Sequence, residues 1–143
     1  MRILIGLIVV LAALVLYVRL APTDSALWHK RPIATAPSDT LTAGSFLAAR
    51  QITAPPAQVL EAVEKIALET PRTRLLAGSV AEGMMTFQTR SLLWGFPDQT
   101  TVAIDGDLLV IYGRLRFGQS DLGINKARVE NWLTALGPLT EPL

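Results

Sequence analysis

The side chains best suited to chemistry in this chain are two aspartates, Asp98 in the turn WGFPDQ and Asp121 in the turn RFGQSDLGIN. Two carboxylates that converge can share acid–base work, as they do in many hydrolases. Acidic residues in turns more often accept hydrogen bonds from backbone N–H groups. A hydrolase that uses Asp98 and Asp121 is therefore an alternative, not the main expectation.

Nucleophilic and metal chemistry find little support in the composition. The chain has no cysteine, and its single histidine, His29, lies in a stretch of flexible character. Nucleophilic catalysis needs a base beside the attacking Ser, Thr or Cys, and a metal site would have to rest on Asp and Asn oxygens alone. We therefore assign no catalytic residue, no metal and no other cofactor. Whether the protein is an enzyme stays open, with the balance against it.

Basic and aromatic side chains accompany the two aspartates. Arg116 and Arg128 flank Asp121 in the sequence. With the carboxylates they can form an anion-binding or partner-binding patch, or a lock of ion pairs and hydrogen bonds that joins the two turns. The lock is the simpler expectation. Trp94 and Phe96 are candidate contacts for a protein partner, and alternatively plugs that close the open end of a sheet.

The candidate binding residues are the side chains of both turns, and of the helix start after them, that can bond, cap or stack. They are Trp94, Phe96, Asp98, Arg116, Ser120, Asp121, Asn125 and Arg128. Gly118 and Gly123 allow the backbone angles of a sharp turn. We expect Asn125 to cap a helix that begins at Lys126.

The first residues form an apolar segment, Ile3–Val18, that contains no charge and lies between two arginines. It is slightly shorter than the roughly 20 residues that cross a bilayer, but Arg19 can snorkel and extend the span. We expect residues 1–21 to be one transmembrane anchor that contacts lipid through residues 3–20. A cleaved secretory signal is the alternative, although no small-x-small site follows the apolar stretch.

The form of this segment also bears on location. A short basic start before an apolar stretch favours the bacterial inner membrane, with one pass and the soluble part in the periplasm. Arg19, Lys30 and Arg31 argue for the opposite orientation. A net charge of +1 does not indicate nucleic-acid binding, which typically needs an excess of Lys and Arg. The expected partners are therefore the membrane and either a protein or a lipid.

The rest of the chain divides into a linker, a domain and a tail. Residues 22–44 hold three prolines and many Ser and Thr without sustained periodicity, which indicates a linker. Trp28 and His29 within it can alternatively dock on the domain or on lipid headgroups. An α+β domain is expected over residues 45–138 and a C-terminal tail over residues 139–143.

Alternating and amphipathic runs within the domain predict five strands and two helices. The strands are expected at 46–52, 73–79, 84–91, 100–105 and 107–117, and the helices at 57–69 and 126–137. The pair Asp105-Gly106 predicts a tight hairpin between the last two strands. The order β-α-β-β-β-β-α implies an antiparallel five-stranded sheet with both helices on one face.

Two motifs, WGFPDQ (Trp94–Gln99) and RFGQSDLGINKARVENWL (Arg116–Leu133), resemble those of the domain of unknown function 1499 family of bacteria and plastids. A weaker third is PRTRLLAGSV (Pro71–Val80). The resemblance implies membership over roughly Ile52–Leu136. It implies no reaction, because the family has no established activity. Many members have a second acidic residue where this chain has Gln99.

The order of elements also resembles that of TATA-binding-protein-like and helix-grip folds, and helix-grip members enclose a ligand between helix and sheet. By this analogy Val59, Val63, Ile66 and Trp132 can line a groove for a small lipid or other apolar ligand. Alternatively these side chains fill the core. The main expectation is a membrane-anchored envelope protein of unknown biochemical role, with a non-catalytic interaction or ligand-binding domain.

Overall fold

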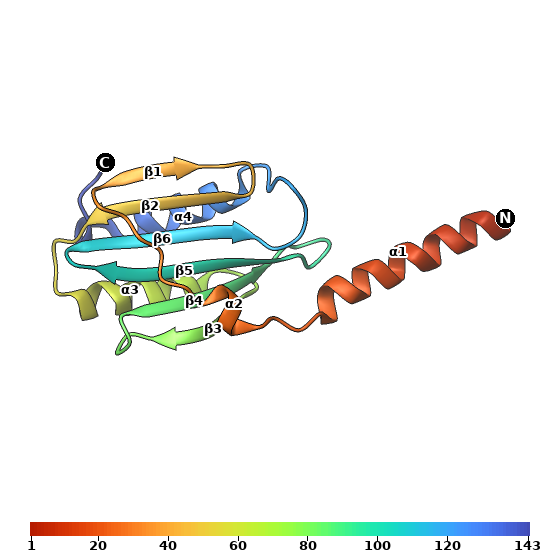
Figure 1. Ribbon diagram of the computed structural model, residues 1–143, viewed down its shortest axis with the longest axis horizontal. Coiled ribbons are helices and arrows are strands. Elements are labelled where there is room, and N and C mark those ends of the chain that lie inside the picture. The colour runs from red at the N-terminus through yellow and green to blue at the C-terminus, as the bar shows by residue number, and fades with distance from the viewer.

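The computed structural model describes residues 1–143 as an antiparallel sheet with two helices on one face and a long N-terminal helix that projects away from it (Figure 1). The strand order in the six-stranded sheet is β1-β2-β6-β5-β4-β3. The α+β class is therefore confirmed. In chain order the elements are α1 (Arg2–Leu20), α2 (Ser25–Trp28), β1 (Ser38–Leu41), β2 (Ser45–Gln51), α3 (Pro56–Glu69), β3 (Thr73–Ser79), β4 (Met84–Arg90), β5 (Pro97–Asp105), β6 (Leu108–Leu115), α4 (Ile124–Leu136) and the 3-10 turn η1 (Gly137–Leu139).

The prediction of five strands is wrong, because β1 adds a sixth at the edge of the sheet. β1 pairs with β2 along its whole length, and its side chains are mostly exposed. A short edge strand that buries neither face needs no apolar alternation, so its sequence looks like that of a linker. A 2.7 Å ion pair between Asp39 of β1 and Arg50 of β2 joins the two strands.

The helices α3 and α4 cover one face of the sheet because each has an apolar side. Proline in the first turn of α3 leaves no hydrogen bond unmade, since the first N–H groups of a helix lack partners. In the core beneath the helices, the rings of Phe87 and Trp132 meet edge to face with centroids 5.8 Å apart. The buried residues of the two helices include Val59, Leu60, Val63, Ala67, Val129, Trp132 and Leu136.

Side chains fill the space where the sequence allowed an apolar groove. Val59 and Val63 are fully buried, Trp132 is 2% exposed, and Ile66 packs against the same cluster. Burying each such side chain contributes roughly 1.5–3 kcal/mol to folding. These residues therefore form the core, which is the alternative that the sequence left open.

The hairpin between β5 and β6 is present, with its turn displaced by one residue from the prediction. Asp105 pairs with Leu108, so the two loop residues are Gly106 and Asp107. Gly106 has a φ of 61°, which glycine adopts without the strain that a side chain would bring. This short turn fixes the register of β5 against β6, on which the site described below depends.

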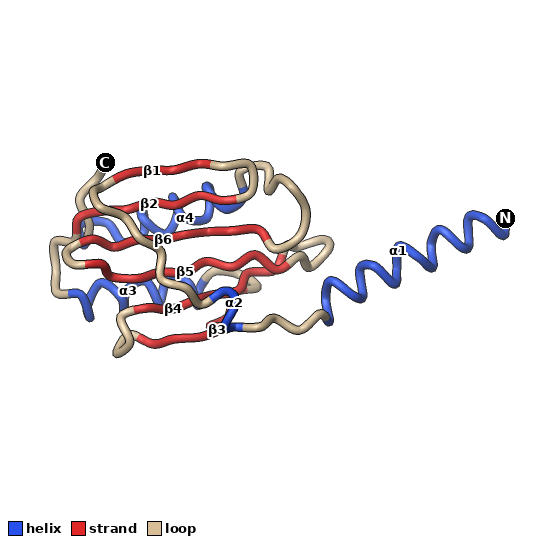
Figure 2. Tube along the Cα trace, viewed as in Figure 1, coloured by secondary structure: helices blue, strands red, loops and turns tan.

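Residues 22–44, expected as a linker without regular structure, lie against the sheet. The chain forms α2 and crosses the sheet face opposite α3 and α4 before it enters β1 (Figure 2). Thr101 donates a hydrogen bond to the Trp28 carbonyl, and Nδ1 of His29 lies 2.8 Å from the Thr86 hydroxyl. Trp28 and His29 thus dock on the domain. We name residues Pro22–Arg31 the strap.

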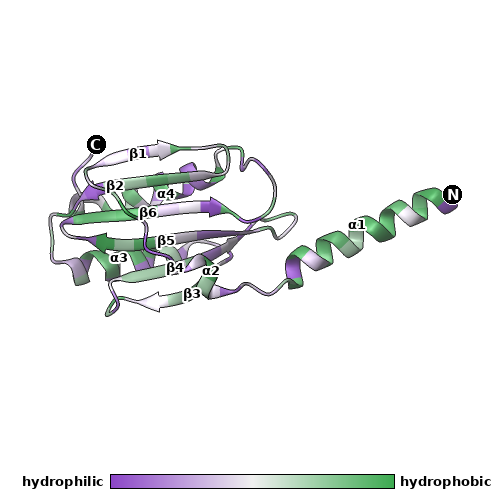
Figure 3. Cartoon of the chain, in the orientation of Figure 1, coloured by the Kyte–Doolittle hydropathy of each residue, from purple (hydrophilic) through white to green (hydrophobic).

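The helix α1 is long and apolar enough to cross a membrane. Figure 3 shows apolar residues along nearly its whole length. Of its residues only Val18, in the last turn, is buried, so α1 is not part of the domain core. The junction between α1 and the domain therefore sets how the domain lies relative to any membrane that α1 enters.

Candidate functional site

Two loops gather at the end of the sheet from which α1 projects (Figure 1). The turn Ser91–Phe96 connects β4 to β5, and the loop Arg116–Gly123 connects β6 to α4. The strands β5 and β6 are paired neighbours, with Asp98 opposite Leu115. Antiparallel pairing brings the start of one strand beside the end of the other. The predicted turns therefore meet at one end of the domain.

Four of the predicted residues form one hydrogen-bonded group at this end, which we name the lock: Asp98, Asp121, Asn125 and Arg128. The Asn125 side-chain amide donates to Asp121 over 2.7 Å and to Asp98 over 3.3 Å. Asn125 is fully buried. Its place above β6 requires glycine at position 113, because a Cβ atom there would lie 2.9 Å from the Asn125 side-chain oxygen.

The role expected of Asn125 as a helix cap belongs to Asp121. The helix α4 begins at Ile124, with Gly123 as its N-cap in the left-handed conformation, so Asn125 already lies inside the first turn. The Asp121 carboxylate accepts hydrogen bonds from the backbone N–H groups of Gly123 and Asn125. A carboxylate suits this position, since it accepts from N–H groups that lack helical partners and lies at the positive end of the helix dipole.

Burial controls the charges of the lock. Desolvation raises the pKa of Asp98 to about 6, and the nearby Asp121 adds to the rise, whereas Arg128 opposes it. The Arg128 guanidinium lies 3.8 Å from the Asp98 carboxylate and donates to Asn125 over 2.8 Å. Burial likewise lowers the pKa of Arg128. The two carboxylates converge on the Asn125 amide, and these hydrogen bonds hold the loop on β5.

The other predicted residues lie outside the lock. Arg116 points to the opposite sheet face and donates to the strap, at the Thr23 hydroxyl over 2.7 Å and the Pro22 carbonyl over 2.8 Å. Ser120 accepts a hydrogen bond from the Leu122 N–H within the loop. Arg116 and Asp121 therefore do not act together, although they are five positions apart in the sequence.

Trp94 and Phe96 are exposed, at 42% and 40%, which excludes the expected alternative that they plug the sheet. The short turn that presents them is closed by hydrogen bonds between Ser91 and Phe96. We name the exposed apolar side chains of the two loops and of the first residue of α4 the apolar tip. It comprises Leu92, Leu93, Trp94, Phe96, Leu122 and Ile124.

Sequence reasoning missed the polar sheet face beneath the strap. Strand pairing places Arg74, Gln88, Gln99 and Arg114 side by side in a cross-strand row. The strap bonds to this row, because Arg114 donates to the Trp28 carbonyl over 2.8 Å. These residues come from four different strands, so only the sheet register reveals the row.

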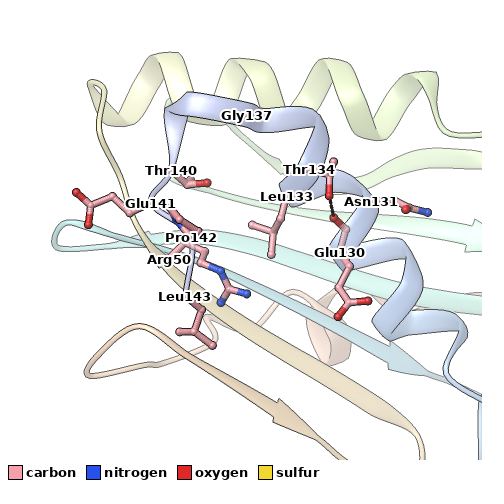
Figure 4. Close-up of a pocket in the computed structure, with 10 residues that line it drawn as sticks. All are labelled: Arg50, Glu130, Asn131, Leu133, Thr134, Gly137, Thr140, Glu141, Pro142 and Leu143. Atoms are coloured by element: carbon pink, nitrogen blue, oxygen red, sulfur yellow. Dashed lines mark hydrogen bonds between the residues drawn. The ribbon is translucent and has the colours of Figure 1, made fainter.

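The C-terminal residues line an open cavity of about 730 Å³ with the end of α4 (Figure 4). Its one cationic side chain, Arg50, is already bonded to Asp39 by two side-chain hydrogen bonds. The residues expected as a C-terminal tail contact the sheet, since the Glu141 N–H donates to the Gln51 carbonyl. No group of three or more His, Cys, Asp or Glu side chains is arranged to hold a metal ion.

Comparison with known proteins gives a family match. The family model described as "Protein of unknown function (DUF1499)" matches residues 26–136, which include both loop motifs. The crystal structure of a DUF4468 family protein from Bacteroides ovatus matches with a TM-score of 0.41 and 15% identity, over 85% of this chain and 100% of that chain. No curated protein matches the chain.

Proposed function

This chain belongs to the DUF1499 family of proteins of unknown function, and from that premise we propose a function from its geometry. The protein is a membrane-anchored, non-catalytic interaction domain whose apolar tip docks on the bilayer that α1 spans. We place α1 in the bacterial inner membrane and the domain in the periplasm, because a basic start before an apolar stretch favours this location and orientation.

The observation that carries the proposal is the contact between α1 and the turn Ser91–Phe96. Arg19, in the last turn of α1, donates to the Leu93 carbonyl over 3.3 Å and to the Trp94 carbonyl over 3.4 Å. The 19 residues of α1 extend over roughly 28 Å at 1.5 Å per residue, close to the thickness of the hydrocarbon layer. The turn therefore lies at the level where α1 leaves the bilayer.

The composition of the apolar tip fits this position. Leu92 and Leu93 are 78% and 71% exposed, and Leu122 on the neighbouring loop is 90% exposed. Soluble domains expose large apolar side chains singly, whereas clusters on one end mark interaction or membrane sites. Trp94 adds an aromatic ring, and tryptophan is enriched at the membrane–water interface.

Contacts at the end of α1 favour an uncleaved anchor over a cleaved signal sequence. Val18 is 4% exposed and Ala21 is 8% exposed, so both are packed against the domain. Arg90 on β4 donates to the Val18 carbonyl. Cleavage beyond Val18 would remove these contacts and expose the side chains that they cover. The protein isolated from membranes is accordingly expected to have the intact mass of the uncleaved chain.

The absence of cysteine allows a direct test of docking. Leu92→Cys places a single nitroxide label on the apolar tip, and Glu82→Cys places a matched label at the exposed β3–β4 connection at the other end of the sheet (Figure 1). In vesicles of neutral phosphatidylcholine, the label at position 92 should collide with oxygen more than with a water-soluble nickel chelate. The label at position 82 should show the reverse. Equal exposure of both labels to nickel would refute the proposal.

A hydrolytic role for Asp98 and Asp121 is the second candidate, and the pKa of about 6 for Asp98 favours it. Against it, both carboxylates accept hydrogen bonds from Asn125. The open cavity of about 530 Å³ beside α4 is lined by Arg128 but by neither carboxylate. If Asp98→Asn and Asp121→Asn variants that fold lose a hydrolytic activity that the wild type shows, the second candidate replaces the first.

A further inference from the structure

Four arginines lie where the strap and α1 meet the sheet, and none has a carboxylate partner. We name them the arginine cluster: Arg19, Arg74, Arg90 and Arg116. The ion pairs of the structure involve other basic residues, namely His29, Arg50, Lys126 and Arg128. The whole chain balances 13 Lys and Arg against 12 Asp and Glu. The cluster is therefore a local excess of positive charge that the rest of the chain does not neutralise.

Neutral groups of the chain hold these guanidinium groups close together. Arg74 donates to Gln88, whose amide donates in turn to the Thr23 hydroxyl, and that hydroxyl also accepts from Arg116. Arg90 follows Gln88 on the same face of β4 and donates to the Gly95 carbonyl over 2.9 Å. These bonds use only part of the five N–H donors that each guanidinium carries.

Like charges also surround Arg90. Burial lowers the pKa of Arg90, and the nearby Arg74, Arg116 and Arg19 lower it further. Such repulsion costs free energy unless an anion enters the cluster. Guanidinium groups bind phosphate oxygens in a bidentate manner, and several arginines around one site are typical of phosphate recognition.

A buried polar side chain beside the cluster lacks any partner within the chain. Gln99 is fully buried, and neither atom of its side-chain amide makes a hydrogen bond. It lies in the cross-strand row between Gln88 and Arg114, both of which bond to the strap. Buried amides are nearly always hydrogen-bonded, so the Gln99 amide is available to a polar group that enters beside the cluster.

We propose that the arginine cluster binds the phosphate of an anionic phospholipid headgroup from the membrane that α1 spans. The assignment to a lipid rests on the proposed function, because Arg19 belongs to the last turn of α1 and bonds to the backbone of the apolar tip. With the tip in the bilayer surface, the cluster lies at headgroup depth. Anionic headgroups concentrate phosphate there, which basic groups next to a span attract.

The test measures lipid retention by the full-length chain. Native mass spectrometry in detergent follows the protein during titration with phosphatidylglycerol, with phosphatidylcholine and with inorganic phosphate. We expect the wild type to retain phosphatidylglycerol at least tenfold more strongly than phosphatidylcholine. Inorganic phosphate at matched concentration should not displace it.

Two double variants that lose the same amount of charge distinguish binding at the cluster from general electrostatic attraction to an anionic lipid. Arg90→Gln with Arg116→Gln removes two charges of the cluster, whereas Lys30→Gln with Lys65→Gln removes two exposed charges that make no side-chain hydrogen bond. The first pair should lose the preference for the anionic lipid, and the second should keep it. Arg74→Gln alone, which leaves the Thr23 contacts in place, should weaken retention several-fold and serves if the double variant fails to fold.

Three results would overturn the inference. They are equal retention of the two lipids by the wild type, equal losses in both double variants, and displacement by inorganic phosphate, which would mean a site for free phosphate. The Leu92 label experiment uses neutral vesicles and does not depend on the cluster. A docked tip without anionic preference therefore refutes only this inference, whereas an undocked tip refutes the proposed function.

Discussion

The side-chain amide of Asn125 lies 2.7 Å from the carboxylate of Asp121, four residues before it, and also donates to the carboxylate of the strand residue Asp98. These contacts tie the start of α4 to β5, and they position Leu122 and Ile124, the residues of the apolar tip that lie between Asp121 and Asn125.

Asn125→Ala removes the bridge between the two carboxylates and leaves both short of a donor in a buried site. The free energy of unfolding should fall by about 2–4 kcal/mol. Urea denaturation in detergent, followed by tryptophan fluorescence, measures the change. Lys126→Ala is the matched control, because it breaks an exposed pair with Glu130 and should cost only a few tenths of a kcal/mol. Equal losses in both variants would contradict the lock.

Asp98 should make stability depend on pH. Its pKa rises from 3.8 to about 6 in the folded state, so between these values the folded protein binds more protons than the unfolded chain. The free energy of unfolding therefore falls as pH rises from about 4 to about 6, by on the order of 2–3 kcal/mol.

Asp98→Asn is expected to remove this part of the pH dependence, because the amide does not titrate. Glu61→Gln, on the exposed side of α3, should keep the wild-type slope. The measurement is the denaturant midpoint at half-unit intervals from pH 4 to pH 7. If Asp98→Asn follows the wild-type curve, another group controls the slope.

Gly113→Ala should destabilise the protein by about 1–3 kcal/mol, because its new methyl group would lie 2.9 Å from the Asn125 side-chain oxygen. In combination with Asn125→Ala the clash partner is absent, so the double variant should cost less than the sum of the single changes. Thermal unfolding of the four proteins completes the cycle. Gly6→Ala is the control, since no atom lies within 4 Å of its new methyl group. Strict additivity would place Gly113 outside the lock.

Thr23→Val should loosen the strap. The Thr23 hydroxyl accepts hydrogen bonds from Gln88 and Arg116, and valine keeps the shape but loses both. Since about 1.4 kcal/mol changes an equilibrium tenfold, trypsin cleavage after Lys30 should become roughly tenfold faster in native conditions. Ser25→Ala, whose hydroxyl makes no hydrogen bond here, should leave the rate unchanged. An unaltered rate in Thr23→Val would show that other contacts hold the strap.

Local patterns in the sequence determined the elements with strong periodicity. The apolar sides of α3 and α4, the hairpin at Gly106 and the uninterrupted apolar run of α1 are all readable from neighbouring residues. The convergence of Asp98 and Asp121 also followed, because a turn before one strand and a loop after its paired neighbour must meet. Each of these depends on short spacings or on a hairpin.

Only the tertiary structure decided the rest. The edge strand β1 and the docked strap bury few side chains of their own, so they leave no periodic pattern in residues 22–44. Asn125 bridges two carboxylates instead of capping α4. Gly113 on β6 leaves space for its side chain, and the sequence alone does not show that β6 lies beneath α4. Arg19, Arg74, Arg90 and Arg116 lie far apart along the chain. Sheet register and the return of the strap bring them together, and neither can be inferred from the residues that surround each arginine in sequence.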